Sequence, residues 1–216
     1  MPEPGRPLVV VVSGMSGAGK SSLVTALAAA LRTSGVPAVE LHFDDFTDVP
    51  DLPGGDLPGW LARGAQPAEW RTPAMDEALA GLLTGEPALA AGPEVVLVEE
   101  PFGRARPPFD VEADLSVHLR LPSQVALARR LLRELAPADG GLDPAGVSAL
   151  RHHLTRFVTE GNALYEAVEV VSLAGADVVL DGLAGQETVT RQALEAVLAR
   201  LARAGPRRPR TSRPAG

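Results

Sequence analysis

The chain has 216 residues and a formal net charge of −7, with 45% hydrophobic and 22% charged residues. This composition is that of a globular protein with one large or two small domains, and it excludes a wholly disordered or fibrous chain. The acidic balance gives the body of the protein no electrostatic basis for binding nucleic acid, and the absence of cysteine excludes disulfides, thiolate metal sites and cysteine nucleophiles. The apolar run at residues 8–12 is too short for a signal or membrane segment, so we expect a cytoplasmic protein.

Apolar, β-branched runs alternate with amphipathic segments along most of the chain. Strands are predicted at residues 8–13, 36–43, 94–99, 114–121 and 178–180. Helices are predicted at residues 21–31, 73–83, 123–135, 143–170 and 186–204, and a loop at 47–59. This alternation predicts an α/β fold with a doubly wound parallel sheet, in a single domain over residues 1–204. Residues 205–216, rich in arginine and proline, are predicted to be a disordered tail; a nucleic-acid role for this tail is the less favoured interpretation.

The strand at 8–13 leads directly into residues 14–21, GMSGAGKS, which fit the phosphate-loop (Walker A) pattern G-x-x-x-x-G-K-[S/T] at every position. Glycines let backbone N–H groups face a phosphate, and the N-terminus of the following helix adds positive potential. Lys20, the one lysine among 20 basic residues, is expected to reach the β- and γ-phosphates, and Ser21 to bind Mg²⁺. The predicted nucleotide-binding residues are Gly14, Ser16, Gly17, Ala18, Gly19, Lys20, Ser21, Ser22 and, from a later helix, Arg130.

Acidic residues end two of the predicted strands. Asp44 and Asp45 follow the second strand, which we expect next to the first, at the edge of the sheet where doubly wound folds bind ligands. Asp44 is the candidate base for an acceptor hydroxyl and a candidate Mg²⁺ ligand, although the pair could also simply end a strand. Glu99 and Glu100 end the third strand at the Walker B position, where two adjacent carboxylates suggest a bound cation. Glu99 is the candidate metal ligand, and a role for Glu100 instead stays open.

Three arginines lie on the predicted helix at 123–135. Arg129 and Arg133 share one face of this helix, and a glycine-rich break follows at 139–141. We predict a lid around residues 129–142 that supplies positive charge to a transferring phosphate; a solvated charged face is the alternative.

Six of the eight aromatic residues lie between positions 43 and 109, where they either stack on a ring of the acceptor or anchor loops. The four histidines show no spacing typical of a metal site, and His42 and His118 are expected to be structural.

Taken in order, these segments resemble the uridine kinase-like branch of P-loop kinases, which includes pantothenate kinase and phosphoribulokinase. The resemblance covers about residues 7–182 and rests on GMSGAGKSS at 14–22, DDFT at 44–47, WRTP at 70–73, VE at 98–99 and ARRLLRE at 128–134. It implies ATP and Mg²⁺ as cofactors and the role of base for Asp44. It also implies acceptor contacts from the second and third segments, for which Asp45, Phe46 and Trp70 are the candidates.

Several positions depart from the pattern of that family. The family's base-reading hairpin is reduced to residues 84–94 without tyrosine or histidine, and its Arg-Gly-Arg after the lid helix is replaced at 137–139. Thr47 stands in place of tyrosine, Arg71 of aspartate and Glu100 of glycine. These departures argue against uridine itself as the acceptor, because selectivity for a base depends on pairing its polar groups.

Arginines around the predicted acceptor site suggest a different substrate. Arg71, Arg104 and Arg106 offer guanidinium forks for a carboxylate or phosphate. We therefore expect a small hydroxylated acceptor, anionic rather than a plain pyrimidine nucleoside, with Arg71 and Arg104 among its contacts.

The sequence thus predicts an ATP- and Mg²⁺-dependent kinase that transfers the γ-phosphoryl group to a hydroxyl of a small metabolite. Lys20, Arg129 and Arg133 would stabilise the transferring charge while Asp44 orients or deprotonates the acceptor. The alternatives are a nucleotide-binding regulator or accessory ATPase, and a nucleoside monophosphate kinase, which Arg71 permits. The expected partner is the small-molecule acceptor, with no nucleic acid and no membrane; a homodimer is compatible with the sequence.

Overall fold

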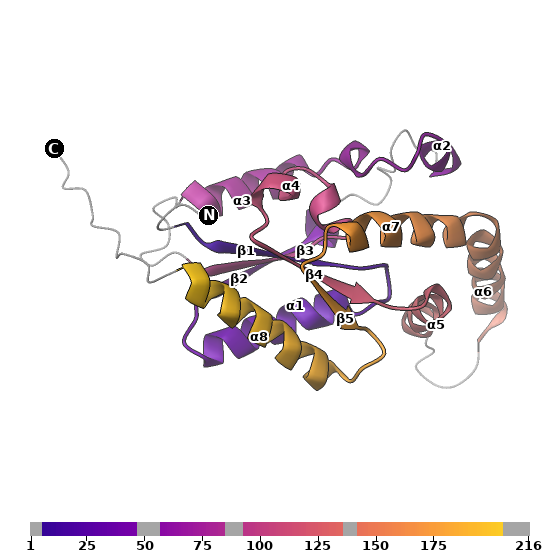
Figure 1. Cartoon of the computed structure of the whole chain (residues 1–216). Coiled ribbons are helices and arrows are strands. Elements are labelled where there is room, and N and C mark those ends of the chain that lie inside the picture. Colours follow the sequence, from indigo (N-terminus) through magenta and orange to yellow (C-terminus); the bar gives the residue numbers. More distant parts are fainter. Residues whose placement is uncertain (1–5, 47–56, 85–92, 136–141, 205–216) are drawn as a thin grey trace.

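The computed structural model of the protein describes residues 6–46, 57–84, 93–135 and 142–204. Within them, five strands form one parallel sheet in the order β2-β3-β1-β4-β5 (Figure 1). The strands are β1 Leu8–Ser13, β2 Ala38–His42, β3 Val95–Glu99, β4 Leu115–Arg120 and β5 Val178–Asp181. Most of the predicted loop at 47–59 and most of the segment 84–94 lie outside the described residues, as do the glycine break at 139–141 and the predicted tail.

Helices connect the strands and cover both faces of the sheet. They are α1 Lys20–Thr33, α2 Leu57–Ala62, α3 Pro73–Thr84, α4 Phe109–Glu112, α5 Ser123–Glu134, α6 Pro144–Arg156, α7 Asn162–Ala174 and α8 Gln186–Ala204. Helices α1 and α8 lie on one face, and α3, α4 and α7 on the other (Figure 1). The predicted doubly wound α/β fold is confirmed. No helix in the described ranges combines the length and apolarity needed to cross a membrane.

The core has two layers because side chains of a strand alternate between the faces of the sheet. Val10 and Val12 of β1 pack in the layer with α1 and α8, whereas Val9 and Val11 pack with α3 and α4 on the other side. All six residues of β1 are buried, as expected for a central strand covered on both faces. This central position fixes the end of β1, where the phosphate loop begins.

The position of β2 corrects the prediction. We expected the second strand next to the first, but β3 lies between them and pairs in parallel with both. The physical reason is burial: every residue of β3 is buried, whereas Glu40 and His42 leave β2 half-exposed and suited to an edge. The strand is also shorter than predicted, and Phe43–Phe46 form a 3₁₀ turn that carries Asp44 and Asp45.

Two helical regions also differ from the prediction. The predicted helix at 143–170 consists of α6 and α7, joined through a π-helical turn at Phe157–Gly161 and ending at Ala174. The last three residues of the predicted loop, 57–59, belong to α2. The short α4 was not predicted because four residues carry no periodic signal.

Candidate functional site

The phosphate loop occupies the turn between β1 and α1, and its glycines are required by its shape. Gly14 has φ 143°, and a Cβ there would lie 2.6 Å from the carbonyl oxygen of Leu119 in β4. Gly17 has φ 88°, and a Cβ there would collide with the carbonyl oxygen of Ala126 in α5. The loop is therefore held between two neighbouring elements in a conformation that only glycine adopts at low cost.

Lys20 and Ser21, at the start of α1, meet Glu99 at the end of β3. The Ser21 hydroxyl donates a hydrogen bond to Glu99 Oε1 at 2.9 Å, and Lys20 Nζ lies 3.9 Å from the same oxygen. The Lys20 side chain is 10% exposed. Burial lowers the pKa of Lys20, while the carboxylates of Glu99, Asp44 and Glu100 act in the opposite direction. A phosphate bound at the loop would supply further negative charge to this ammonium group.

The oxygens of Ser21 and Glu99 fit a Mg²⁺ ion that arrives with a nucleotide. Mg²⁺ commonly takes one or two protein oxygens and completes its shell with phosphate oxygens and water. Among the described residues, no group of three or more His, Asp or Glu side chains is placed to hold a metal by itself. The contact between Ser21 and Glu99 identifies these two oxygens as candidate metal ligands, and no contact of Asp44 with either residue is seen in the ranges that the structure describes.

Glu99 and Glu100, although adjacent, have different partners. Glu100 is fully buried, and its Oε2 accepts from Arg106 Nε at 2.9 Å and Nη2 at 2.7 Å. Its Oε1 accepts from the backbone N–H of Phe102 at 3.1 Å. Burial raises the pKa of Glu100, with Arg106 opposing that shift. Glu100 is thus occupied by Arg106, which leaves Glu99 as the carboxylate that faces the phosphate loop.

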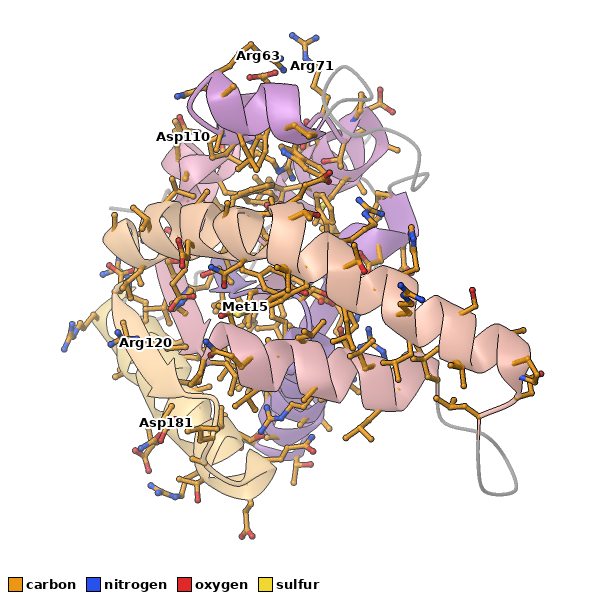
Figure 2. All side chains as sticks on the ribbon, turned by 90° about the vertical axis from the view of Figure 1, so that its right-hand side faces the viewer. Met15, Arg63, Arg71, Asp110, Arg120 and Asp181 are labelled. Atoms are coloured by element: carbon orange, nitrogen blue, oxygen red, sulfur yellow. The ribbon has the colours of Figure 1, made fainter. Side chains whose placement is uncertain are left out.

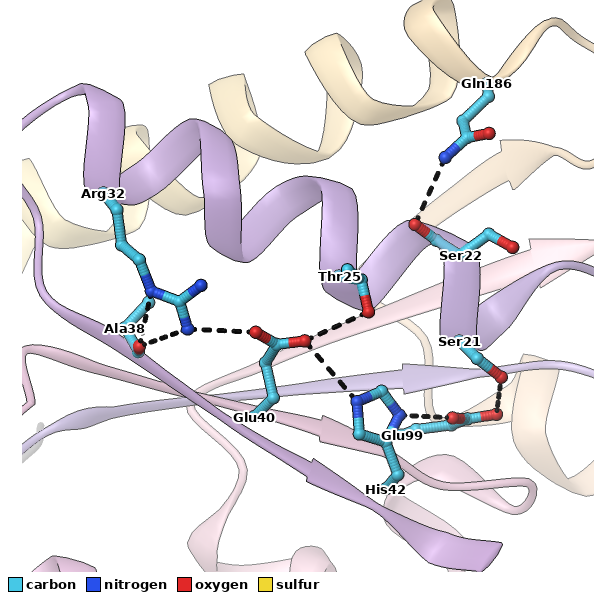
Figure 3. Close-up of polar contacts among 9 residues, drawn as sticks. All are labelled: Ser21, Ser22, Thr25, Arg32, Ala38, Glu40, His42, Glu99 and Gln186. Atoms are coloured by element: carbon cyan, nitrogen blue, oxygen red, sulfur yellow. Dashed lines mark hydrogen bonds and ion pairs between the residues drawn. The ribbon is translucent and has the colours of Figure 1, made fainter.

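His42 is a site residue that the sequence reasoning assigned only a structural role. Its Nδ1 donates to Glu99 Oε2 at 2.8 Å, and its Nε2 lies 3.5 Å from Glu40 Oε2 (Figure 3). Although burial lowers it, contact with Glu99 and Glu40 holds the pKa of His42 above its ordinary value. Glu40 is itself fixed by Arg32 at 2.9 Å and Thr25 at 3.1 Å. This chain of contacts orients the carboxylate of Glu99. The sequence contained a hint of it, because residues two apart in a strand face the same side, so His42 and Glu40 of β2 point the same way.

A cavity of 310 Å³ opens beside Lys20 and contains the predicted base. Asp44 lines it together with Lys20, Glu99 and Arg133, so four of the charged residues predicted for chemistry share one space. The phosphate loop and the start of α1 form one side of the cavity, with Met15 and the serine hydroxyls of this segment. The opposite side is mostly apolar or aromatic and comes from Phe43, Trp70, Pro101, Phe102, Leu164, Tyr165 and Val168. We refer to this space as the acceptor cavity. Asp45 and Phe46 do not line it: Asp45 is exposed, and Phe46 packs against the core beside α3.

Three of the aromatic residues pack against one another beside the acceptor cavity. Trp60, Trp70 and Phe102 form a cluster with ring centroids 5.5–6.0 Å apart. Trp60 is fully buried and anchors the segment around α2, while Trp70 and Phe102 extend the same cluster to the wall of the acceptor cavity.

The structure does not bring the other predicted acceptor arginines together. Arg71 is exposed and lies at the outer edge of the molecule, away from Met15 of the phosphate loop (Figure 2). Arg104 pairs with Asp177 at 2.8 Å and does not line the acceptor cavity. Arg106 is 1% exposed, bound to Glu100 and stacked over Phe43 and Phe109. Each of these guanidinium groups thus has a structural partner or faces solvent, and none of them lines the acceptor cavity.

A second cavity, of 370 Å³, lies on the other side of the phosphate loop. Arg129 and Arg133 of α5 line it, and Arg129 donates to the carbonyl oxygen of Gly182 at 3.0 Å. Arg133 borders both cavities, whereas Arg130 borders neither and pairs with Glu134 at 2.7 Å. Of the predicted nucleotide-binding residues, those lining one or both cavities are Ser16, Gly17, Ala18, Gly19, Lys20, Ser21 and Ser22.

Comparison with solved structures supports the fold. A protein from Silicibacter sp. TM1040, described as a fructose transport system kinase, aligns with a TM-score of 0.55 and 22% sequence identity over 83% of this chain and 92% of that one. A shikimate kinase from Aquifex aeolicus aligns over 90% of this chain and 98% of that one, with a TM-score of 0.46 and 17% identity. The chain thus has the α/β fold of P-loop proteins.

Comparison of sequences adds less. No protein-family model matches the chain. Midasin of Dictyostelium discoideum is 42% identical over 73 residues, which are 34% of this chain and 1% of that protein. The chain therefore spans only a very small part of this relative, and its site must be interpreted from its own geometry.

Proposed function

We propose that this protein is an ATP-dependent kinase that transfers the γ-phosphoryl group to a hydroxyl of a small molecule. The observation that carries the proposal is that Asp44, Lys20 and Glu99 line one cavity, although they come from three separate segments. A phosphate loop alone serves many reactions, but a carboxylate that shares a cavity with its lysine suits a bound acceptor hydroxyl. The similarity to a described kinase structure agrees with this proposal.

The two cavities would divide the substrates between them. The 370 Å³ cavity beside Arg129 would hold the nucleoside end of ATP, and the phosphate loop would carry the triphosphate toward the 310 Å³ acceptor cavity. Arg133 borders both cavities and would stabilise the negative charge of the γ-phosphoryl group during transfer. The backbone N–H groups of the loop would bind and orient the phosphates, as they do in loops of this pattern.

Each charged side chain of the acceptor cavity has a separate task. Asp44 would accept the proton of the acceptor hydroxyl and hold its oxygen in line with the phosphorus. Lys20 would hold the γ-phosphate, and Ser21 with Glu99 would hold Mg²⁺, which when bound neutralises charge shared by the β- and γ-phosphates. His42 would keep Glu99 in position by holding its second oxygen, at 2.8 Å.

The wall of the acceptor cavity favours an uncharged acceptor with an apolar or ring-shaped body. Apart from Lys20 and Arg133, whose charge the phosphoryl group would use, no basic side chain of the described residues lines this cavity. Trp70 and Phe102 offer flat aromatic surfaces instead. The nucleoside monophosphate alternative loses its support because Arg71, the residue that suggested it, does not reach the cavity.

The test is a screen of nucleosides, sugars and other small alcohols for acceptor-dependent release of ADP, with the best acceptor then used on two variants. Asp44→Asn should lose transfer while binding ATP normally, because Asp44 lines the acceptor side of the loop. Asp45→Asn is the matched control, since Asp45 is the neighbouring acid and lies outside the cavity; it should retain activity. ATP hydrolysis that no added alcohol stimulates would favour the regulator or accessory ATPase, and equal loss in both variants would remove Asp44 from the mechanism.

A further inference from the structure

A third cavity, larger than the two of the proposed site, lies between α7, β5 and the loop after β4. It has a volume of 710 Å³ and a floor of buried apolar residues that includes Met15, Leu121 and Leu180. Val170 and Val179 on its lip are exposed, Val170 to 68%. We call it the β5 groove. It adjoins the acceptor cavity at Met15 and Tyr165, but it contains neither Asp44, Lys20 nor Glu99, so the proposed phosphoryl transfer gives the rest of the groove no task.

The β5 groove combines this apolar surface with uncompensated negative charge. Glu166 and Asp181 line it, both are exposed, and in the described part of the chain neither forms an ion pair. The one arginine in the groove, Arg120, lies 3.8 Å from a third acid, Glu169. The strand at the edge, β5, pairs only with β4, so its outer backbone groups are also uncovered within the described sheet. Exposed apolar area of this kind typically marks an interaction surface.

A second exposed surface of the same chain has the complementary character. Helix α6 has no buried residue. Val147, Arg151 and Leu154 follow one another along it at positions i, i+4 and i+7, and Val158 comes next in the π-helical turn Phe157–Gly161. The three apolar residues are exposed, Val158 to 79%. Arg151 makes no ion pair with any described residue, and α6 contains no acidic side chain. We call these four residues the α6 stripe. The stripe is apolar and basic, so it complements the β5 groove, which is apolar and acidic.

We propose that the α6 stripe of one copy docks in the β5 groove of a second copy, and the reverse, in a two-fold symmetric homodimer. The groove and α6 open on the same side of the molecule, the side that faces the viewer in Figure 2, where Arg120, Asp181 and Met15 mark the groove. A helix with apolar anchors at these spacings is a common occupant of an apolar groove.

The stripe cannot reach the groove of its own chain. Helix α6 continues through the π-helical turn Phe157–Gly161 into α7, which is itself a wall of the groove, and no loop separates them that would let α6 fold back. A two-fold pair removes this obstacle and forms the contact twice. Two such contacts also bring the buried area toward the roughly 1,200–2,000 Å² of a stable interface, which one helix in one groove would not reach.

The test is a charge exchange followed by sedimentation equilibrium on the full chain. Arg151→Glu and Glu166→Arg should each weaken dimerisation by about tenfold or more, because each places like charges together in both contacts. An equimolar mixture of the two variants should dimerise again. In the mixed dimer, one contact pairs the introduced glutamate of one chain with the introduced arginine of the other, and the second contact pairs the natural arginine with the natural glutamate. Arg203→Glu, at an exposed position near the end of α8, is the matched control and should behave like the unchanged protein.

Each other outcome would overturn the proposal. A chain that stays monomeric at concentrations up to hundreds of micromolar has no such dimer. A dimer that both variants leave intact uses another surface, and variants that weaken dimerisation without recovery in the mixture are acting through something other than this contact. None of these results depends on enzymatic activity, so failure of the dimer and failure of the proposed kinase are distinguishable.

Discussion

Replacing Glu99 and Glu100 one at a time by glutamine should give opposite results, although the two residues are neighbours. Glu100→Gln removes the nearer of the two carboxylates that pair with Arg106, a guanidinium that is 1% exposed and lies 2.7 Å from Glu100 Oε2 and 3.7 Å from Asp76 Oδ1. Breaking one side of a buried ion pair costs about 3–5 kcal/mol, because the remaining charge has no water. The glutamine carbonyl can still accept the hydrogen bond from Phe102, so we expect the lower end, about 3 kcal/mol. In a protein of this length that lowers Tm by roughly 6–12 °C.

Glu99→Gln should affect the metal instead of the fold. Glu99 accepts from Ser21 at 2.9 Å and from His42 at 2.8 Å, and an amide oxygen preserves one of these contacts. We expect a stability change of about 1 kcal/mol, together with a loss of turnover on the order of 10²-fold and a raised Mg²⁺ requirement. Thermal unfolding without ligands and turnover against Mg²⁺ concentration measure the two effects separately. A raised Mg²⁺ requirement in Glu100→Gln with an unchanged Tm would refute this assignment of the two carboxylates.

Three further predictions concern the loop and the centre of the sheet. Lys20→Ala should lower turnover by on the order of 10²–10⁴-fold, measured at saturating ATP, because it removes a preorganised cation from the transferring phosphate. Gly14→Ala should destabilise the protein by about 1–3 kcal/mol in denaturant unfolding, since a Cβ would lie 2.6 Å from the Leu119 carbonyl oxygen at φ 143°. Burial lowers the pKa of His118, opposed by Glu169 and assisted by Arg120 and Lys20. The unfolded chain therefore takes up this proton first, so the free energy of unfolding should fall as the pH drops below about 6.5. His118→Gln should flatten that slope between pH 8 and pH 5, and an unchanged slope would contradict the assignment.

The parts of the structure that the sequence predicts best are those whose information is local. The phosphate loop, β1 and α1 are consecutive, and the strained glycines between them have few other uses. The edge position of β2 was not predicted, because the order of strands depends on which one is most completely buried. The sequence did indicate which of the two strands is more buried, since β3 is apolar up to Glu99 whereas β2 carries Glu40 and His42.

The division of labour between Glu99 and Glu100 follows from side-chain parity, but only once the faces of the sheet are known. Along β3, Val95 and Leu97 pack with α1 and α8, and Glu99 continues that set toward Ser21. Val96 and Val98 pack with α3 and α4, and Glu100 continues that set toward Arg106. The sequence shows the alternation, but not which face carries the phosphate loop. The alternation along β3, together with the contact between Ser21 and Glu99, shows which face of the sheet carries the phosphate loop.

The arginines show why charge alone does not locate a substrate site. Arg104 and Arg106 follow β3 closely enough to suggest acceptor contacts, yet their partners are Asp177 and Glu100. Asp177 is 73 residues away along the chain, so no local pattern could have revealed that pair. Away from the phosphate loop, the wall opposite Asp44 is mostly aromatic, and the two cations of the cavity, Lys20 and Arg133, are assigned to the transferring phosphate. A charged acceptor would therefore leave water for that wall without a cation of its own. An uncharged alcohol avoids this cost, so the screen should find its best acceptors among neutral molecules. A preference for phosphorylated or carboxylated acceptors would refute this interpretation of the cavity wall.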